Sequence, residues 1–550
     1  MQPCSHHRHR GCDGFWTKQN GVRLSTDQVD TPRNLGRVIA ASSAGTLIEW
    51  YDFYIFGSLA VTLADVFFPS GGGAAALLST LATFAIGFVV RPFGAIFFGY
   101  LGDRIGRKYT FMVTLLLMGG ATFLIGVLPG FDAHGSWPGI GWAAPILLVL
   151  LRLLQGLALG GEYGGAATYV AEHAPDGKRG FWTSWIQTTA TLGLFLSLVV
   201  IILCRNAMSR EDFAAWGWRI PFWLSMLLVI FSYYIRRRMN ESPLFARIKA
   251  SGKTARNPLK ESFGNRKNLR LVLLALFGAT AGQGVVWYTG QFYALNFMKI
   301  TLGVDPTQAE YMIGIALVVA TPFFIVFGAL SDRIGRKKIM LTGCLLAVAT
   351  YYPIYTAMLA VADVTDVSRF RVITTDTGAP PRVDQLPADP ARGLPARTVT
   401  TTWSSRTYQD GTMSTTTTAS TAAGDDAPRV TAKHSLRFHS LASAPALKLM
   451  LLVWVQVLYV TMVYGPIAAF LVELFPTRIR YSSMSLPYHI GNGVFGGMVP
   501  FIGQLLVVRT GNPLAGLWYP MSVAALTVVV GAIFIREKRN VRMWDEGAAT

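Results

Sequence analysis

Long apolar runs constrain this chain more than any other feature of its 550 residues. We count twelve of them, each long enough for the ~20 residues with which an α-helix crosses a bilayer. Because the bilayer interior offers no water to backbone N–H and C=O groups, such a run crosses it as a helix. Only 14% of the residues are charged, against ~25% in soluble domains. The sequence therefore predicts an all-α, polytopic membrane protein and excludes a soluble enzyme, a fibrous protein and a disordered chain.

The spans fall into two groups of six. They lie at 36–62, 75–100, 109–130, 143–171, 181–204 and 216–235, and then at 269–298, 308–330, 338–361, 446–472, 483–508 and 516–536. We predict an N-terminal six-helix bundle over 35–235, a basic cytoplasmic linker over 236–268 and a C-terminal six-helix bundle over 269–540. Residues 541–550 form a cytoplasmic tail in this prediction.

Lys and Arg are concentrated in every second loop. Residues 236–268 carry ten of them, whereas the loops at 63–74 and 131–142 carry none. Basic loops stay on the cytoplasmic side, so this alternation predicts that both termini are cytoplasmic. The net charge of +19 thus reports membrane topology, and we expect no nucleic-acid partner.

Two segments lie outside the twelve spans. The tail at 1–34 is His-rich and contains Cys4 and Cys12, which could bind a metal, but we predict a disordered cytoplasmic tail and no metal site. Residues 363–445 form a Thr-rich insertion that the loop count places on the periplasmic side. Its alternating Thr, Val and Trp residues are typical of a small β-hairpin, and low-complexity disorder is the alternative. We assign this insertion no role in function.

A loop motif occurs twice in the chain. Gly99–Lys108 and Gly328–Lys337 share the pattern Gly-x-x-x-Asp-Arg-Ile-Gly-Arg-Lys at an offset of 229 residues. A second pattern, Glu-x-x-Pro-x-x-x-Arg, occurs at Glu172–Arg179 and Glu473–Arg480 at an offset of 301. The offsets differ by about the length of the Thr-rich insertion. Two six-span repeats, the second interrupted once, explain both, and such parallel repeats place a substrate site at their interface.

The repeated loop resembles the signature of the major facilitator superfamily. Within it, the chain resembles the metabolite:H⁺ symporter family, which includes α-ketoglutarate, citrate, shikimate and proline/betaine permeases. The stretches that carry this resemblance are Glu49–Phe53, Arg91–Gly94, Arg152–Gly165, Trp216–Pro221 and Glu241–Pro243. The resemblance implies a bacterial inner-membrane transporter that works by alternating access. It extends to neither the tail nor the insertion, and it does not identify the substrate.

Ionisable residues inside the spans are costly and call for a reason. Glu49 and Asp52 share a helix face at i and i+3. A carboxylic acid in a partly desolvated cavity holds its proton to higher pH, so Glu49, Asp52 and, nearer the cytoplasmic end, Glu162 are candidates for proton coupling. Arg91 and Arg152 are candidates for binding a substrate carboxylate, because a guanidinium holds one with two hydrogen bonds. The alternative is that these acids and arginines pair with one another structurally.

Polar side chains also form a stripe on the seventh span. Gln283, Trp287 and Gln291 recur at i, i+4 and i+8 and so face protein or water instead of lipid. We predict that they line the substrate path, with interhelical hydrogen bonding as the alternative. On the eleventh span, His489 could relay protons, although a structural histidine is the simpler interpretation.

The repeated loops have a different predicted role. By family resemblance, their charged residues form a gate that latches the outward-facing state, and they do not bind substrate. These gating residues are Asp103, Arg104, Arg107, Asp332, Arg333 and Arg336.

The sequence contains no nucleotide-binding loop, zinc-ligand spacing or nucleophile elbow. We therefore expect neither an enzyme nor an ATP-driven pump, and no cofactor. The predicted function is secondary active, proton-coupled symport of a small mono-, di- or tricarboxylate by a monomer embedded in lipid. The alternatives are a symporter of a zwitterionic osmolyte or other neutral metabolite, and a non-transporting sensor built on a transporter fold.

Overall fold

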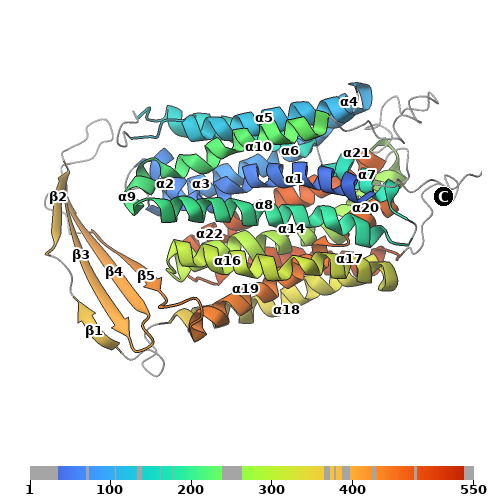
Figure 1. The fold of residues 1–550 in the computed structure, drawn as a ribbon. Helices are drawn as coiled ribbons and strands as arrows, with labels where there is room; N and C mark the ends of the chain where they lie inside the picture. The colour runs from blue at the N-terminus through green and yellow to red at the C-terminus, as the bar shows by residue number, and fades with distance from the viewer. Residues whose placement is uncertain are drawn as a thin grey trace, which may run out of the picture.

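The computed structural model is a bundle of helices with a β-sheet beyond one end (Figure 1). It describes residues 35–69, 73–105, 107–132, 139–161, 163–175, 177–237, 263–363, 372–376, 380–386, 397–423, 429–475 and 480–537. Of the predicted site residues, Glu162 lies outside the described residues, as do the side chains of Asp103, Arg104 and Arg107.

Helices cover each of the twelve predicted spans. The first half of the chain contains α1 (Leu35–Ser58), α2 (Ala60–Phe67), α3 (Gly73–Val89), α4 (Arg91–Ile105), α5 (Arg107–Val127), α6 (Ala143–Gly160), α7 (Tyr163–His173), α8 (Arg179–Ala207), α9 (Arg210–Ala215), η1 (Gly217–Arg219) and α10 (Ile220–Arg237). The second half contains α13 (Arg266–Ala275), η2 (Leu276–Thr280), α14 (Ala281–Tyr288), η3 (Thr289–Tyr293), α15 (Ala294–Asn296), η4 (Phe297–Thr301), α16 (Pro306–Ala320), α17 (Pro322–Ile334), α18 (Arg336–Ala362), α19 (Ala444–Tyr464), α20 (Ile467–Leu474), α21 (Arg480–His489), η7 (Ile490–Gly496), α22 (Val499–Thr510), η8 (Ala515–Leu517) and α23 (Trp518–Phe534).

Nine helical stretches among the described residues are long and apolar enough to cross a membrane. Two shorter apolar helices, Met112–Val127 and Gly217–Phe231, lie in the predicted third and sixth spans. The helix in the first predicted span, α1, carries the carboxylates of Glu49 and Asp52.

Several predicted spans are broken helices, and the breaks lie at proline or glycine. The second span divides into α3 and α4 beside Pro92, the fourth ends α6 at Gly160, and the tenth divides at Gly465 and Pro466. Proline lacks the N–H that continues a helix, and neighbouring helices can satisfy the freed backbone groups within a bilayer. The seventh and eleventh spans instead contain π-helical turns, at η2, η3, η4 and η7. Such turns re-aim the side chains that follow them, and they are frequent at functional sites.

Close backbone packing joins both α3 and α4 to α6. A Cβ atom added to Gly156 would collide with the carbonyl of Gly87, and one added to Gly160 would collide with the carbonyl of Arg91. Only glycine allows so close an approach, which is a common basis for helix association in membranes. This contact fixes the position of α4, on which Arg91 begins the helix.

The Thr-rich insertion forms an antiparallel five-stranded sheet. Its strands are β1 (Val372–Asp376), β2 (Arg382–Leu386), β3 (Arg397–Tyr408), β4 (Met413–Ala423) and β5 (Arg429–Arg437). The order is β1-β3-β4-β5, and β2 also pairs with β3. Strands β3 and β4 form a hairpin whose Asp-Gly turn places Gly411 at φ +78°, a conformation that glycine adopts without strain. Of the two alternatives for the insertion, β structure is the one observed for its described residues.

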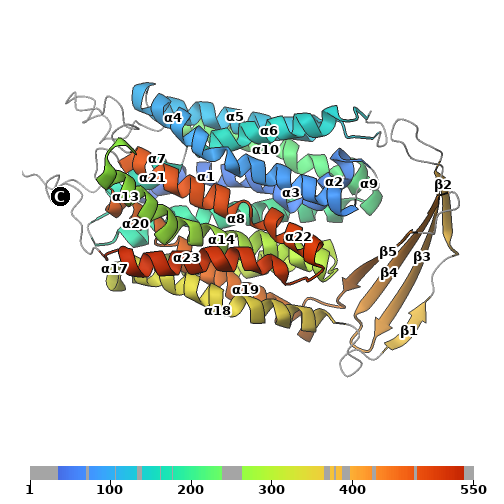
Figure 2. The same cartoon turned by 180° about the vertical axis from the view of Figure 1, so that it is seen from behind.

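The sheet is attached to the bundle by a short segment, 436–438, which we call the strap. Leu436 donates its backbone N–H to the carbonyl of Gly303 at 2.7 Å and accepts the N–H of Asp305 at 2.8 Å. The Gln308 amide bonds both the N–H and the carbonyl of Phe438, at 2.9 and 2.8 Å. Figure 2 shows the sheet at one end of the bundle, the sheet end, away from the end where α17 finishes. The latter, where the repeated loops lie, is called the motif end below.

Candidate functional site

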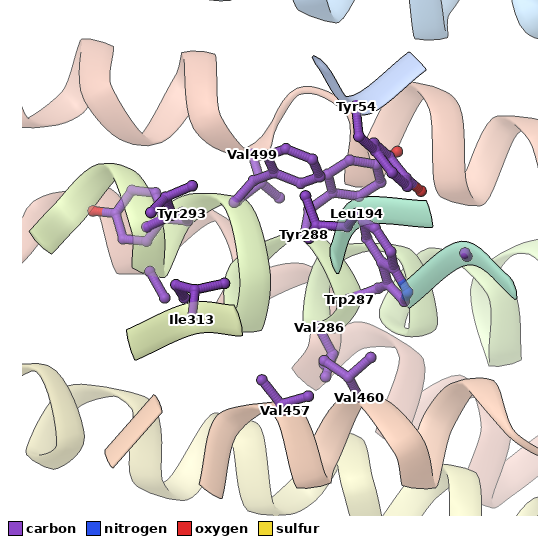
Figure 3. Close-up of a cluster of buried hydrophobic side chains, with 14 of the residues drawn as sticks. Tyr54, Leu194, Val286, Trp287, Tyr288, Tyr293, Ile313, Val457, Val460 and Val499 are labelled. Carbon is purple, nitrogen blue, oxygen red and sulfur yellow. The ribbon is translucent and has the colours of Figure 1, made fainter. Parts of the chain in front are cut away.

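An aromatic cluster fills the middle of the molecule between the two halves of the chain. The Tyr54 ring on α1 lies 5.4 Å from Trp287 on α14, and Trp50 lies 6.4 Å from Trp287. Figure 3 shows Tyr54 of α1 beside Trp287 and Tyr288 of α14. All four rings are buried. Their packing encloses the interface at which an internal repeat would place a substrate.

Arg91 enters this cluster with a buried positive charge. Its side chain is 1% exposed, and its guanidinium carbon lies 4.0 Å from the Phe88 ring centre, 4.4 Å from that of Phe53 and 5.3 Å from that of Trp50. Among the described residues it has no carboxylate partner, and its Nε and Nη2 atoms make no hydrogen bond. The Phe88 ring in turn packs edge-on against that of Tyr288, at 5.0 Å between ring centres. Cation–π contacts offset only part of the cost of burying such a charge.

Arg152 lies deeper within the first half. It donates to Gln155 Oε1 at 2.6 Å, and Gln155 in turn donates to Thr122 Oγ1 at 2.6 Å. The guanidinium also stacks on Phe53, with 4.1 Å from its carbon to the ring centre. Local hydrogen bonds thus hold Arg152, whereas Arg91 faces the second half.

The two carboxylates of the first span are buried on α1. Glu49 is 1% exposed and Asp52 is fully buried. The Asp52 carboxylate lies beside the hydroxyl of Ser225 on α10. No ion pair joins Asp52 to Arg91 or Arg152 in the part of the chain that the structure describes.

The polar stripe of the seventh span divides into two kinds of residue. Gln283 and Asn492 exchange two hydrogen bonds, at 3.0 and 2.8 Å, which bind the seventh span to the eleventh. Trp287 and Gln291 are also buried, but the indole N–H and both amide atoms of Gln291 lack a hydrogen-bond partner among the described residues. Trp287 and Gln291 are thus the members of the stripe that retain hydrogen-bonding capacity.

Tyrosines connect the two halves on the motif-end side of Arg91. The rings of Tyr163 on α7 and Tyr488 on α21 stack at 3.4 Å with 1° between their planes. Gln187 donates to the Tyr163 hydroxyl at 2.7 Å, and the hydroxyls of Tyr464 and Tyr488 lie 2.8 Å apart. Residues from both halves therefore close the interface here.

A charged network joins the halves at the motif end. The Asp332 carboxylate accepts the backbone N–H groups of Gly180 and Phe181 at 2.8 and 2.9 Å, which caps the N-terminus of α8. Arg336 contacts Asp332 at 2.8 Å and Glu473 at 3.0 Å, and Glu473 lies 3.7 Å from Arg179. Asp332 and Arg336 thus lie at a contact between the halves, whereas the predicted gating residue Arg333 is exposed. We call this network the motif-end latch.

A second network joins the halves at the sheet end. Glu310 on α16 contacts Lys299 at 2.8 Å and Arg205 on α8 at 3.6 Å. Lys299 also donates to the carbonyl of Ser58 on α1 at 3.3 Å, and Arg210 contacts Asp305 at 3.1 Å. We call this network the sheet-end latch. A cavity of about 810 Å³ lies beside it, between α8, α9, α16 and the strap.

Sequence reasoning missed several of these residues, although signals were present. Glu310 lies inside the predicted span 308–330, and Lys299 lies one residue beyond the end of 269–298. Arg179 and Glu473 belong to the second repeated pattern, to which no role was assigned. No local pattern marked the tyrosines at the interface as a group, because they come from five separated spans; they are Tyr54, Tyr163, Tyr288, Tyr464 and Tyr488.

Comparisons with known proteins identify the family. The family model for sugar (and other) transporters matches residues 38–270, and that for MFS/sugar transport proteins matches 165–377. The inner membrane metabolite transport protein YhjE of Escherichia coli (strain K12) is 39% identical over 58% of this chain and 71% of its own. Alpha-ketoglutarate permease from the same organism is 36% identical over 60% and 73%. The glycine betaine/proline/ectoine/pipecolic acid transporter OusA of Dickeya dadantii is 35% identical over 56% and 62%.

Solved structures share the fold at low sequence identity. The proton:xylose symporter XylE bound to 6-bromo-6-deoxy-D-glucose superposes with a TM-score of 0.63 at 17% identity, over 92% of this chain and 97% of that one. A partially occluded inward-open form of XylE from E. coli gives 0.60 at 15% identity, over 92% and 98%. The apolar spans, the repeated loops and these relatives agree, and the chain belongs to the major facilitator superfamily as a transporter of small metabolites.

Proposed function

We propose that this transporter carries a small organic acid together with protons across the bacterial inner membrane. The observation that carries the proposal is Arg91, a buried cation at the interface of the two halves with no carboxylate partner among the described residues. A buried charge without a counter-ion is costly, and a substrate carboxylate would supply the missing charge with two hydrogen bonds. The α-ketoglutarate permease is a relative named for such an acid.

The surrounding rings would favour a small substrate with an apolar body. Trp50, Tyr54, Trp287 and Tyr288 offer flat apolar surfaces, while Gln291 and the Trp287 indole N–H offer hydrogen bonds. Small-molecule sites typically have an apolar wall with a few well-placed polar groups. Arg152 would act indirectly in this scheme, because Gln155 and the stack on Phe53 already hold it.

The acidic residues of α1 would couple transport to protons. Asp52 is fully buried and lies beside a hydroxyl, not beside an arginine. Such a carboxyl can bind and release a proton as the surrounding helices move, without first breaking an ion pair. Glu49 and Glu162 remain proton-coupling candidates with Asp52. The two latches would act as alternating gates, with both termini cytoplasmic and the protein working as a monomer.

A zwitterionic substrate is the second candidate, and the aromatic cluster favours it. Trp50, Tyr54 and Trp287 lie within 6.4 Å of one another, and adjacent aromatic faces can bind a quaternary ammonium. A betaine would place its carboxylate at Arg91 and its cation among the rings. OusA is a relative whose name includes glycine betaine.

Uptake into proteoliposomes under an imposed pH gradient tests both candidates. Purified protein is reconstituted with radiolabelled 2-oxoglutarate, succinate or glycine betaine, and an ionophore that collapses the gradient is the control. The proposal predicts gradient-driven accumulation of an acid, lost in Arg91→Met. Accumulation of betaine alone would favour the second candidate. Ligand binding without any transport would favour a sensor and contradict both.

A further inference from the structure

His489 is a buried base to which the proposed function gives no role. Its side chain is 1% exposed, and neither ring nitrogen has a hydrogen-bond partner among the described residues. The ring of the preceding residue, Tyr488, packs edge-on against it at 5.4 Å. A buried polar group without a partner is uncommon in folded proteins and asks for an explanation, such as a ligand that occupies the site for part of a functional cycle.

The fold brings His489 and Arg91 together from opposite halves of the chain. His489 ends α21, which packs against α4, the helix that Arg91 begins. One turn beyond His489, a Cβ atom added to Gly493 would lie 3.8 Å from Arg91 Cδ. Two basic groups with unsatisfied nitrogens therefore face one interface, one from each half.

Few other charged groups act on His489. Among the described residues of the elements packed against α21, α4 contributes Arg91, α7 contributes Tyr163 through its stack on Tyr488, and α20 contributes Glu473, which belongs to the motif-end latch. Tyr464 on α19 reaches the same place through its hydroxyl contact with Tyr488. η2 and η7 carry no ionisable side chain, and the basic residues of α13 are exposed at its first turns. Arg91 is thus the dominant charge facing His489.

Like charges in a desolvated site repel, so a second cation beside Arg91 is costly while the site is empty. A substrate with two carboxylates changes this balance. One carboxylate neutralises Arg91, and the other accepts a hydrogen bond from a protonated imidazole, which has two N–H donors. The proton comes from water, and no bond of the substrate changes.

We propose that Arg91 and His489 form a two-point site for a dicarboxylate, and that His489 takes up one proton as the second carboxylate binds. This inference rests on the proposed function, since it names the class of acid. Because the two groups belong to opposite halves, a dicarboxylate that bridges them also holds the halves together. A monocarboxylate or a betaine would engage Arg91 alone.

Isothermal titration of the purified full-length protein with matched ligand pairs tests the proposal. Succinate is compared with butyrate, and 2-oxoglutarate with 2-oxovalerate, each in two buffers of different ionisation enthalpy so that proton uptake is measured directly. One additional charge-assisted hydrogen bond predicts about tenfold or more tighter binding of the dicarboxylate. We expect about one proton taken up per dicarboxylate and none per monocarboxylate.

His489→Gln separates this role from a structural one. We expect it to remove both the dicarboxylate preference and the proton uptake while leaving monocarboxylate affinity unchanged. The control is His434→Gln at an exposed position of strand β5, which should leave the binding of both ligand classes unchanged. Equal affinities for the two ligand classes in the parent protein, or an equal loss for both in His489→Gln, would overturn the two-point site while leaving the proposed function intact. Failure of every carboxylate to bind would overturn both.

Discussion

Arg91 is stabilised by aromatic rings and by no opposite charge among the described residues. Cation–π contacts contribute roughly 2 kcal/mol when desolvated, whereas removing a guanidinium from water costs several kcal/mol. We therefore expect Arg91→Met to abolish carboxylate binding and to raise, by about 1 to 4 kcal/mol, the free energy of unfolding measured without substrate. A buried charge that destabilises the empty protein is explained if its role is to bind the substrate.

Arg336 provides the matched control for this prediction. It is also a buried arginine, but it contacts two carboxylates, at 2.8 and 3.0 Å. Arg336→Met leaves Asp332 with only the α8 N-terminus and Glu473 with only Arg179, so it should lower stability by up to about 3 to 5 kcal/mol. Thermal unfolding of both variants in detergent measures the contrast. A lower melting temperature for Arg91→Met would show that Arg91 is structural.

Asp52 carries a prediction about coupling. If it holds the transported proton, Asp52→Asn abolishes accumulation driven by a pH gradient but retains exchange of substrate at equal concentrations. Exchange survives because the loaded carrier returns without releasing a proton. Both assays are run on the same vesicles, with Glu49→Gln in parallel. If exchange and accumulation fall together with the yield of folded protein, the carboxylates are structural.

At the scale of elements, the sequence predicted the helices well and their internal geometry poorly. Apolar runs and the hydrogen-bonding demand of the bilayer locate each span, so the seventh span, predicted at 269–298, is observed from 266 to 301. The π-helical turns depend on how that helix packs against the eleventh, which no local pattern encodes. Contacts between distant helices were equally hidden from the sequence at the candidate site. Gln283 and its partner Asn492 are 209 residues apart, so sequence alone left its substrate-lining and interhelical interpretations open.

The strap gives the insertion a structural connection that its composition did not suggest. It bonds the start of α16, two residues before Glu310 of the sheet-end latch. We expect Gln308→Leu, which removes two hydrogen bonds to Phe438, to lower the free energy of unfolding by about 1 to 3 kcal/mol. Replacing 370–425 with a short flexible linker retains the strap and should leave both stability and uptake unchanged. Loss of transport in that deletion, at normal membrane abundance, would show that the sheet itself takes part.

At the scale of the whole molecule, the two latches join the same halves at opposite ends. Glu310 contacts Lys299 and Arg205 at the sheet end, while Asp332 caps α8 and contacts Arg336 at the motif end. Arg205 lies near the C-terminal end of α8, whose N-terminus Asp332 caps, so one helix enters both networks. For substrate to reach either side of the membrane, the latch at that end must open. The latch that stays closed stabilises the conformation open at the other end.

This opposition predicts that breaking each latch opens a different end. Spin labels at Glu211→Cys and Ser440→Cys report the sheet end, and labels at Lys178→Cys and Lys338→Cys report the motif end, all at exposed positions. Glu310→Gln should lengthen the distance between the two sheet-end labels, and Asp332→Asn the distance between the two motif-end labels. Breaking a buried ion pair costs about 3 to 5 kcal/mol. Because roughly 1.4 kcal/mol is a tenfold change, this cost shifts a two-state equilibrium by about a hundredfold or more. Pulsed electron–electron double resonance measures both distances, in a protein whose native cysteines are replaced by serine. Widening of the same end by both variants would contradict alternating latches. If instead Glu310→Gln widens only the sheet end and Asp332→Asn only the motif end, the two networks oppose each other through one equilibrium. The double variant should then populate both open conformations.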